Sequence, residues 1–149
     1  MTPRVPGAVL LVAGAATAVV PGFTWFTGPP PATPTHASGF AGAGQLWLLP
    51  LLGVLIALAG AGFISARPGA GRAVARWAGP LSLAAGLIAA ALAVWAASDP
   101  VVTLRVTTDG LTETVPVAVT LEPAAFAAPV IAGLAAVIGA VATRVGWRR

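Results

Sequence analysis

Four long apolar segments constrain this chain more than any other feature of its sequence. Each contains no ionisable residue and is close to the about 20 residues that a helix needs to cross the hydrocarbon core of a bilayer. The segments are Val5–Pro21, Leu46–Ile64, Trp77–Ala97 and Ala124–Thr143. We therefore predict an all-α membrane protein in which residues 1–149 form a single domain, a bundle of four transmembrane helices.

The composition indicates that lipid is the main solvent of this chain. Charged residues make up only 8% of it and the mean hydropathy is +0.93, whereas a soluble domain carries about 25% charged residues. The chain has no cysteine, which excludes a disulfide framework and thiolate chemistry. Its basic residues are all arginine, and alanine, glycine, valine and proline abound. That bias is typical of a GC-rich bacterial genome such as an actinobacterium's.

The arginines predict how the bundle is oriented. All except Arg105 fall at one set of segment ends, and the four acidic residues fall on the opposite side. The positive-inside rule then places both termini, a basic turn at 65–76 and a basic tail at 144–149 in the cytoplasm of a bacterial cell (plasma) membrane. The predicted topology determinants are Arg67, Arg72, Arg76, Arg144, Arg148 and Arg149, with Arg4 at the start of the chain. Because topology accounts for the net charge of +4, we expect no nucleic-acid partner.

The first segment has an alternative interpretation as a signal peptide. Arg4, an apolar stretch and the small residues Ala16-Thr17-Ala18 fit that pattern. The apolar run continues past the small residues to Val20, which favours a membrane span. Both interpretations stay open at this stage.

The tryptophans and the small residues predict further features of the spans. Trp is favoured at membrane interfaces, so we expect interface anchors at Trp25, Trp47, Trp77, Trp95 and Trp147. Small residues four apart predict close helix packing, at Gly53, Ala57 and Ala61, at Ser82, Gly86 and Ala90, and at Ala132, Ala136 and Ala140. We expect Pro50, Pro80 and Pro129 in the first turns of their helices, and helix–helix hydrogen bonds from Thr17 and Ser82.

The two predicted extracytoplasmic segments differ in character. The first, residues 22–45, contains a run of prolines and predicts a structureless linker. Its lone histidine, His36, is interpreted as a solvated loop residue. The second, residues 99–122, alternates apolar and polar residues about Asp109-Gly110, a strong signal for a β-hairpin between the third and fourth helices. The predicted register pairs Thr108 with Leu111, Val106 with Glu113, Leu104 with Val115 and Thr103 with Pro116.

The predicted hairpin has one valine-rich face and one threonine-rich face. The apolar face, a candidate partner-docking surface, comprises Val102, Leu104, Val106, Val115, Val117 and Val119. An isolated hairpin is marginal in water, so this face must cover something. The simpler interpretation is that it folds over the outer ends of the protein's own helices, and the alternative is that it docks a partner.

The sequence contains none of the motifs that mark a catalytic, phosphate-binding or metal-binding site. No ionisable residue lies inside a predicted span, which argues against a proton-coupled transporter or a voltage sensor. Asp99 and Glu122, which flank the hairpin, are interpreted as solvated interfacial carboxylates. No phosphate-cradling loop, zinc spacing or nucleophile–base pair is present. We therefore expect no enzyme activity, no catalytic residue, no cofactor and no metal site.

The layout resembles the actinobacterial tryptophan-associated (trp-operon-region) transmembrane proteins. The resemblance rests on a first span ending near Trp25, on Leu46-Trp47-Leu48-Leu49-Pro50-Leu51-Leu52 opening the second, on a short arginine turn, and on an Ala-rich third span ending near Trp95. It covers the chain in layout and implies no particular activity. The hairpin with its threonine face departs from it.

Two functions fit these observations. The first is a non-catalytic accessory subunit, or an assembly or stabilising factor, of a larger bacterial membrane complex in respiration, transport or the cell envelope. Its partners would be the lipid bilayer and other integral membrane proteins. The second is a stand-alone carrier of a small ligand, or a homo-oligomer, with a cavity lined by His36, Arg105 and the outer carboxylates.

Overall fold

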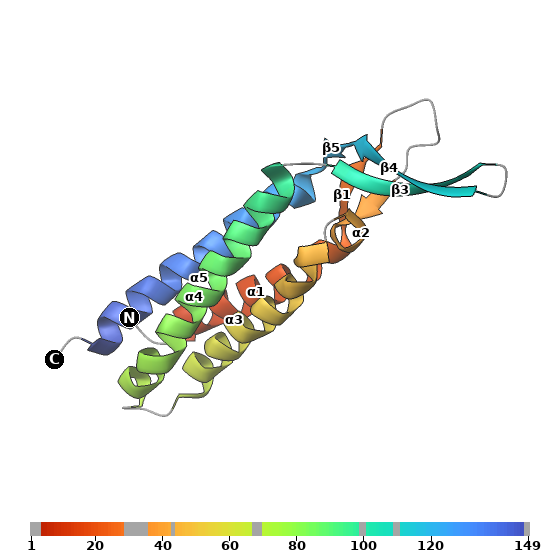
Figure 1. The fold of residues 1–149 in the computed structure, drawn as a ribbon. Helices are drawn as coiled ribbons and strands as arrows, with labels where there is room; N and C mark the ends of the chain where they lie inside the picture. The colour runs from red at the N-terminus through yellow and green to blue at the C-terminus, as the bar shows by residue number, and fades with distance from the viewer. Residues whose placement is uncertain are drawn as a thin grey trace.

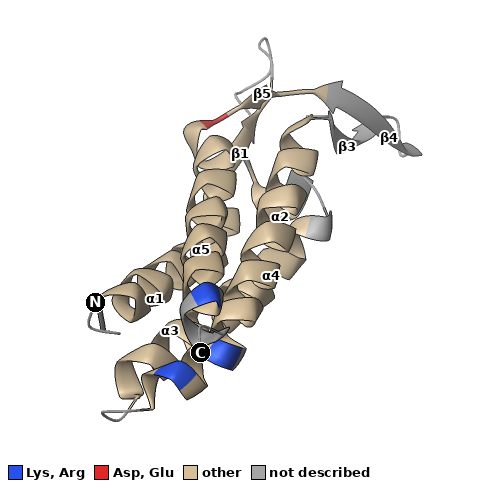
Figure 2. Cartoon of the chain, turned by 90° about the vertical axis from the view of Figure 1, so that its left-hand side faces the viewer, with Lys and Arg blue, Asp and Glu red and all other residues tan. Residues whose placement is uncertain are grey.

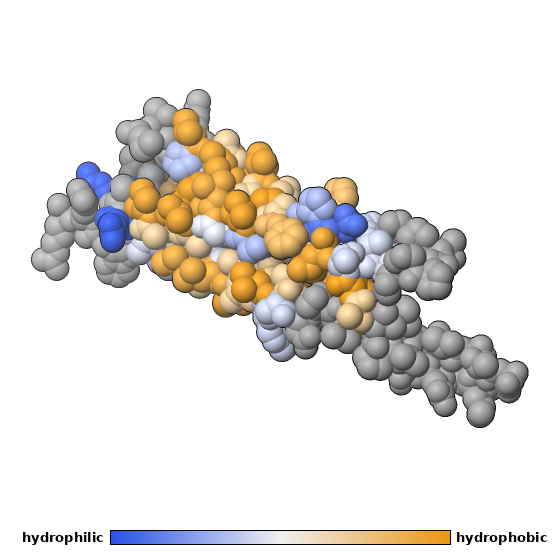
Figure 3. Space-filling view, turned by 90° about the horizontal axis from the view of Figure 1, so that it is seen from above, coloured by the Kyte–Doolittle hydropathy of each residue, from blue (hydrophilic) through white to orange (hydrophobic). Residues whose placement is uncertain are grey.

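The computed structural model describes residues 4–28, 36–42, 44–66, 70–98, 101–108 and 111–147. Its frame is a bundle of four long helices, and α1 begins at the same end of the bundle at which α5 ends (Figure 1). Each of the four is long and apolar enough to cross a bilayer, and apolar side chains cover much of the bundle face seen in Figure 3. The fold is that of a multi-pass membrane protein. The four helices are α1 (Arg4–Val19), α3 (Leu48–Ser65), α4 (Gly71–Ser98) and α5 (Pro123–Trp147).

The described charges separate to opposite ends of the bundle (Figure 2). Arg72 and Arg76 lie at the start of α4 and Arg144 near the end of α5, and this end is called the arginine end. Glu122 precedes α5 at the opposite end, called the strand end because all five strands lie there. The separation agrees with the predicted charge pattern, although Arg67, Arg148, Arg149 and the side chain of Arg4 lie outside the described residues.

Helix α4 begins at Gly71, six residues before the predicted span starts at 77. Arg72 and Arg76 therefore lie on its first two turns instead of in a basic turn. Pro80 consequently lies inside α4, not in its first turn, and as a proline it donates no N–H to the preceding turn. Pro129 is also inside its helix, and Pro50 lies in the first turn of α3 as predicted.

The helices associate as two tight pairs, α1 with α3 and α4 with α5, and glycines form both contacts. A Cβ added to Gly53 would lie 2.5 Å from the backbone nitrogen of Ala18, and one added to Gly86 would lie 2.7 Å from that of Ala136. Small residues allow such backbone approach in lipid. The small residues at these contacts recur seven apart: Gly7 and Gly14, Gly53 and Gly60, Gly79 and Gly86, and Ala132 and Gly139.

A spacing of seven keeps the small residues along the line of contact between two helices that wind about each other. The predicted spacing of four identified part of these contacts, since Ala57 meets Gly14 and Ala136 meets Gly86. Ala61 and Ala140, the last members of two predicted stripes, are only partly buried.

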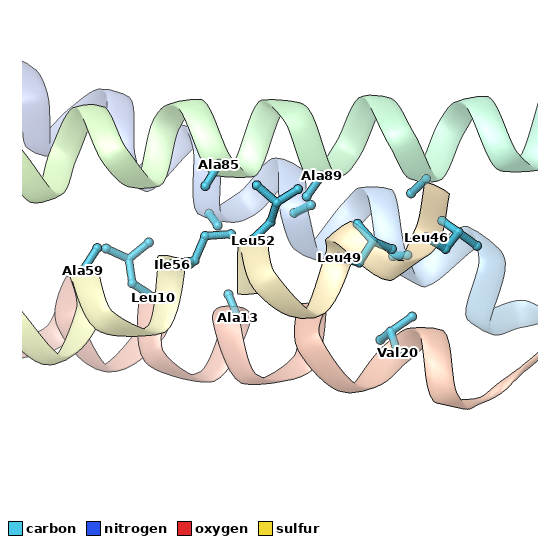
Figure 4. Packing of buried hydrophobic residues seen from close by; sticks show 14 of the residues in the cluster. Leu10, Ala13, Val20, Leu46, Leu49, Leu52, Ile56, Ala59, Ala85 and Ala89 are labelled. Atoms are coloured by element: carbon cyan, nitrogen blue, oxygen red, sulfur yellow. The ribbon is translucent and has the colours of Figure 1, made fainter. Parts of the chain in front are cut away.

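The core lies where the two pairs meet, and its large side chains come mostly from α3. Leu49, Leu52 and Ile56 point from α3 toward α4, which presents Ala85 and Ala89 to them (Figure 4). Leu10 adds a large side chain from α1. Small residues on α4 thus accept the larger ones of α3, and the buried cluster is built from apolar side chains.

The strand end is more ordered than the predicted linker. Strand β1 (Thr24–Thr27) lies between β2 (His36–Ser38) and β5 (Thr120–Leu121) in an antiparallel sheet. Short helices η1 (Val20–Gly22), α2 (Gly39–Gly42) and η2 (Gly44–Trp47) complete the connection. The linker prediction is therefore wrong at both ends of 22–45, and the proline run at 29–35 lies outside the described residues.

The predicted hairpin is present as β3 (Val101–Thr108) and β4 (Leu111–Ala118). All four predicted pairings are confirmed, including Thr103 opposite Pro116. The two strands form a sheet of their own and extend sideways away from the bundle (Figure 1). Val119 lies beyond β4 and packs against the buried cluster, so it belongs to the core and not to the hairpin face.

Candidate functional sites

A hydrogen-bonded junction at the strand end joins residues far apart in sequence. The backbone N–H of Glu122 donates to the Trp25 carbonyl at 2.9 Å. The Thr27 hydroxyl donates to the Glu122 carboxylate (Oγ1 to Oε1) at 2.6 Å, and the Thr120 hydroxyl donates to the Thr27 carbonyl at 3.1 Å. Glu122 is thus a structural partner of β1, which corrects its interpretation as a solvated carboxylate. Its negative charge also lies at the N-terminus of α5, where the helix dipole favours it.

Trp25 belongs to this junction and is not a lipid-facing anchor. Its side chain is 0% exposed and its indole N–H donates to the Val20 carbonyl at 2.8 Å. The chain turns back through η1 directly before β1, which carries Trp25 over the end of the bundle. Trp47, Trp77 and Trp95 are exposed, as interface anchors require. The side chain of Trp147 lies outside the described residues.

The buried hydroxyls bond within their own helices. Thr17 Oγ1 donates to the Ala13 carbonyl at 2.8 Å, and Ser82 Oγ donates to the Gly79 carbonyl at 3.1 Å. The expected helix–helix hydrogen bonds are therefore replaced by bonds to the preceding turn. Among the described side chains, no buried polar atom lacks a partner, and no group of three His, Asp or Glu residues could hold a metal ion.

The candidate docking surface on the hairpin is defined by its register. Val102 lies opposite Val117 and Leu104 opposite Val115. Residues opposite each other in an antiparallel pair share a face, so the pairing of Val106 with Glu113 adds a carboxylate to the predicted apolar set. The side chains of residues 101–117 lie outside the described part of the chain.

An apolar groove lies between α1 and α5, and sequence reasoning missed it. One cavity of about 530 Å³ is at the arginine end, and a second of about 500 Å³ continues it toward the middle of the bundle. Among the described side chains, no carboxylate lines either cavity, and the side chains of His36 and Arg105 lie outside the described residues. The available signal was a row of valines, because Val5, Val9 and Val12 recur at helical spacing where the other seams carry glycine.

Comparison with family models, with curated protein sequences and with solved structures finds no match to this chain.

Proposed function

We propose that this chain is a non-catalytic accessory subunit, or an assembly or stabilising factor, of a larger complex in the bacterial plasma membrane. The observation that carries the proposal is the β3–β4 hairpin, which extends away from the bundle and forms a two-stranded sheet of its own. An isolated hairpin has too little packing to be stable in water. A partner that covers its valine-rich face or extends its edge supplies that packing.

The bundle itself favours a scaffold role over a carrier role. Its helix pairs meet at backbone contact through glycines, which leaves no path for a solute inside either pair. The described cavities are apolar and lie along one seam. The partners of such a protein are lipid and other integral membrane proteins. Membership of the actinobacterial tryptophan-associated proteins, which the layout resembles, stays a prediction.

The proposed orientation has the arginine end in the cytoplasm, with the hairpin outside. The chain contains no cysteine, so single cysteines report on topology without background. Ser65 and Ser98 are both exposed serines that end a helix, one at each end of the bundle. In intact cells, we expect a membrane-impermeant maleimide to label S98C and not S65C. Labelling of S65C alone contradicts the proposed orientation.

The docking proposal is tested by purifying the tagged protein from its native host in mild detergent and identifying stoichiometric partners by mass spectrometry. Leu104→Asp places a charge in the middle of the predicted apolar face, and Thr107→Asp places the same charge on the predicted polar face. We expect the first variant to lose the partner complex and the second to retain it. Recovery of the chain alone, or equal partner recovery by both variants, overturns docking through this face.

A further inference from the structure

The seam between α1 and α5 is built unlike the seams inside the two helix pairs. Its floor is buried, with Phe63, Ala75 and Ala142 each less than 9% exposed. Its rim is exposed, at Val5 on α1 and at Val137 and Val141 on α5. A groove with a buried floor and an exposed apolar rim is open to lipid along its length.

The groove has the length of one bilayer leaflet. The two cavities adjoin at Val9, and together they extend along α1 from Val5 to Ala16. At about 1.5 Å per residue this is about 16 Å of helix axis, and half of a hydrocarbon core of about 30 Å is about 15 Å. An acyl chain of the leaflet at the arginine end therefore matches the groove in length and in chemistry.

Among the described residues that line the two cavities, one has a charged side chain. Arg72 lines the cavity at the arginine end, lies in the first turn of α4 and is exposed. Every other described lining residue of either cavity is apolar or glycine. The guanidinium thus marks the end of the groove nearest the bilayer surface, where a lipid phosphate lies, and its fork of N–H donors suits phosphate oxygens.

We propose that this groove binds one anionic phospholipid, with an acyl chain between α1 and α5 and the phosphate at Arg72. The occupant is a lipid chain and not a helix of a second copy, because α1 and α5 remain in contact beneath the groove and admit no helix between them. The charge at the mouth selects an anionic headgroup. This proposal does not depend on docking by the hairpin, and we expect Leu104→Asp to leave lipid binding unchanged.

The charge contribution is measured by native mass spectrometry of the full chain titrated with phosphatidylglycerol or with phosphatidylcholine. We expect Arg72→Gln to weaken phosphatidylglycerol binding about fivefold and to weaken phosphatidylcholine binding less, because the choline of that lipid offsets the charge of its phosphate. Arg144→Gln is the matched control, because Arg144 is exposed at the same end and does not line the groove. Equal losses in the two variants overturn the assignment of the phosphate to Arg72.

The groove itself is tested by filling it. Val9→Trp places a large side chain where the two cavities adjoin, and Val137→Trp does so from the exposed rim, where misfolding is less of a risk. We expect either variant to lower binding of both lipids at least tenfold, whereas Val54→Trp, on an exposed position of α3, has no effect. Unchanged binding in a folded Val137→Trp variant, or a homodimer that excludes lipid from the wild-type groove, overturns the proposal.

Discussion

The seams inside the helix pairs and the seam between α1 and α5 solve the same packing problem in opposite ways. Inside the pairs, glycines seven apart bring backbones together so closely that a Cβ would meet main-chain atoms. Between α1 and α5, valines stand at the corresponding positions and hold the helices apart above a groove. In lipid, side-chain size at the contact therefore decides whether a seam is closed or open to a ligand.

The largest expected effect concerns the side chains that hold the two pairs together. Ile56 is fully buried where the pairs meet, and Leu58 is exposed on the same helix. We expect Ile56→Ala to lower the free energy of unfolding by about 2 kcal/mol, at the low end of the range for buried aliphatics because lipid tails are also apolar. Leu58→Ala is the control with little expected effect. Reversible unfolding in bicelles measures both, and equal values show that α3 does not join the pairs.

We expect a single methyl group added inside a closed seam to lower the stability of the protein. In Gly14→Ala the new Cβ meets the backbone of Gly53 and Ala57, neither of which can move aside as a side chain can. We expect a loss of about 1–3 kcal/mol. Gly133→Ala adds the same carbon to α5 where nothing lies within 4 Å, and we expect it to be neutral or stabilising by up to about 1 kcal/mol. A destabilised Gly133→Ala with an unaffected Gly14→Ala contradicts this account of the closed seam.

The strand-end junction is expected to contribute less, as a single hydrogen bond to a carboxylate. Thr27→Val removes the donor and Glu122→Ala removes the acceptor of the bond between Oγ1 and Oε1. We expect each variant to lose about 1.5 kcal/mol, with a non-additive double variant in a double-mutant cycle. Additive losses show that the two side chains do not interact in the membrane.

The open seam is expected to show the smallest effect on stability. Val12 is 65% exposed on the groove wall. Because its side chain already contacts lipid in the bundle, separation of the helices changes its environment little. We expect Val12→Ala to change the free energy of unfolding by less than about 0.5 kcal/mol. A loss comparable to that of Gly14→Ala removes the distinction between the closed and open seams.

The sequence predicted most of the fold because two strong signals control it. Apolar length predicts the four helices, and alternation about Asp109-Gly110 predicts the hairpin and its register, both as the structure has them. Helix ends were less predictable, because α4 extends beyond its apolar stretch into the residues around Arg72 and Arg76. Helix formation there continues past the membrane-length segment, which hydropathy alone does not report.

The sites were less predictable because they depend on contacts between distant residues. Trp25 is a residue type expected at a membrane interface, yet its side chain is buried and its indole N–H bonds to the Val20 carbonyl of η1. The bond between Thr27 and Glu122 joins residues 95 positions apart, and neither residue indicates its partner by spacing. The groove likewise requires α1 to lie beside α5, an adjacency that apolar periodicity in either helix does not specify.

The strand-end junction also forms late in the synthesis of this chain. Strand β1 is made after the first helix, whereas β5 and Glu122 follow the third, so their pairing closes a loop of most of the chain. The Trp25 carbonyl accepts its hydrogen bond from the backbone N–H of Glu122, which is made only after α4. A chain whose synthesis stops before residue 120 therefore has α1 and α3 to form one pair, but it lacks β5, Glu122 and α5, and the strand end stays open.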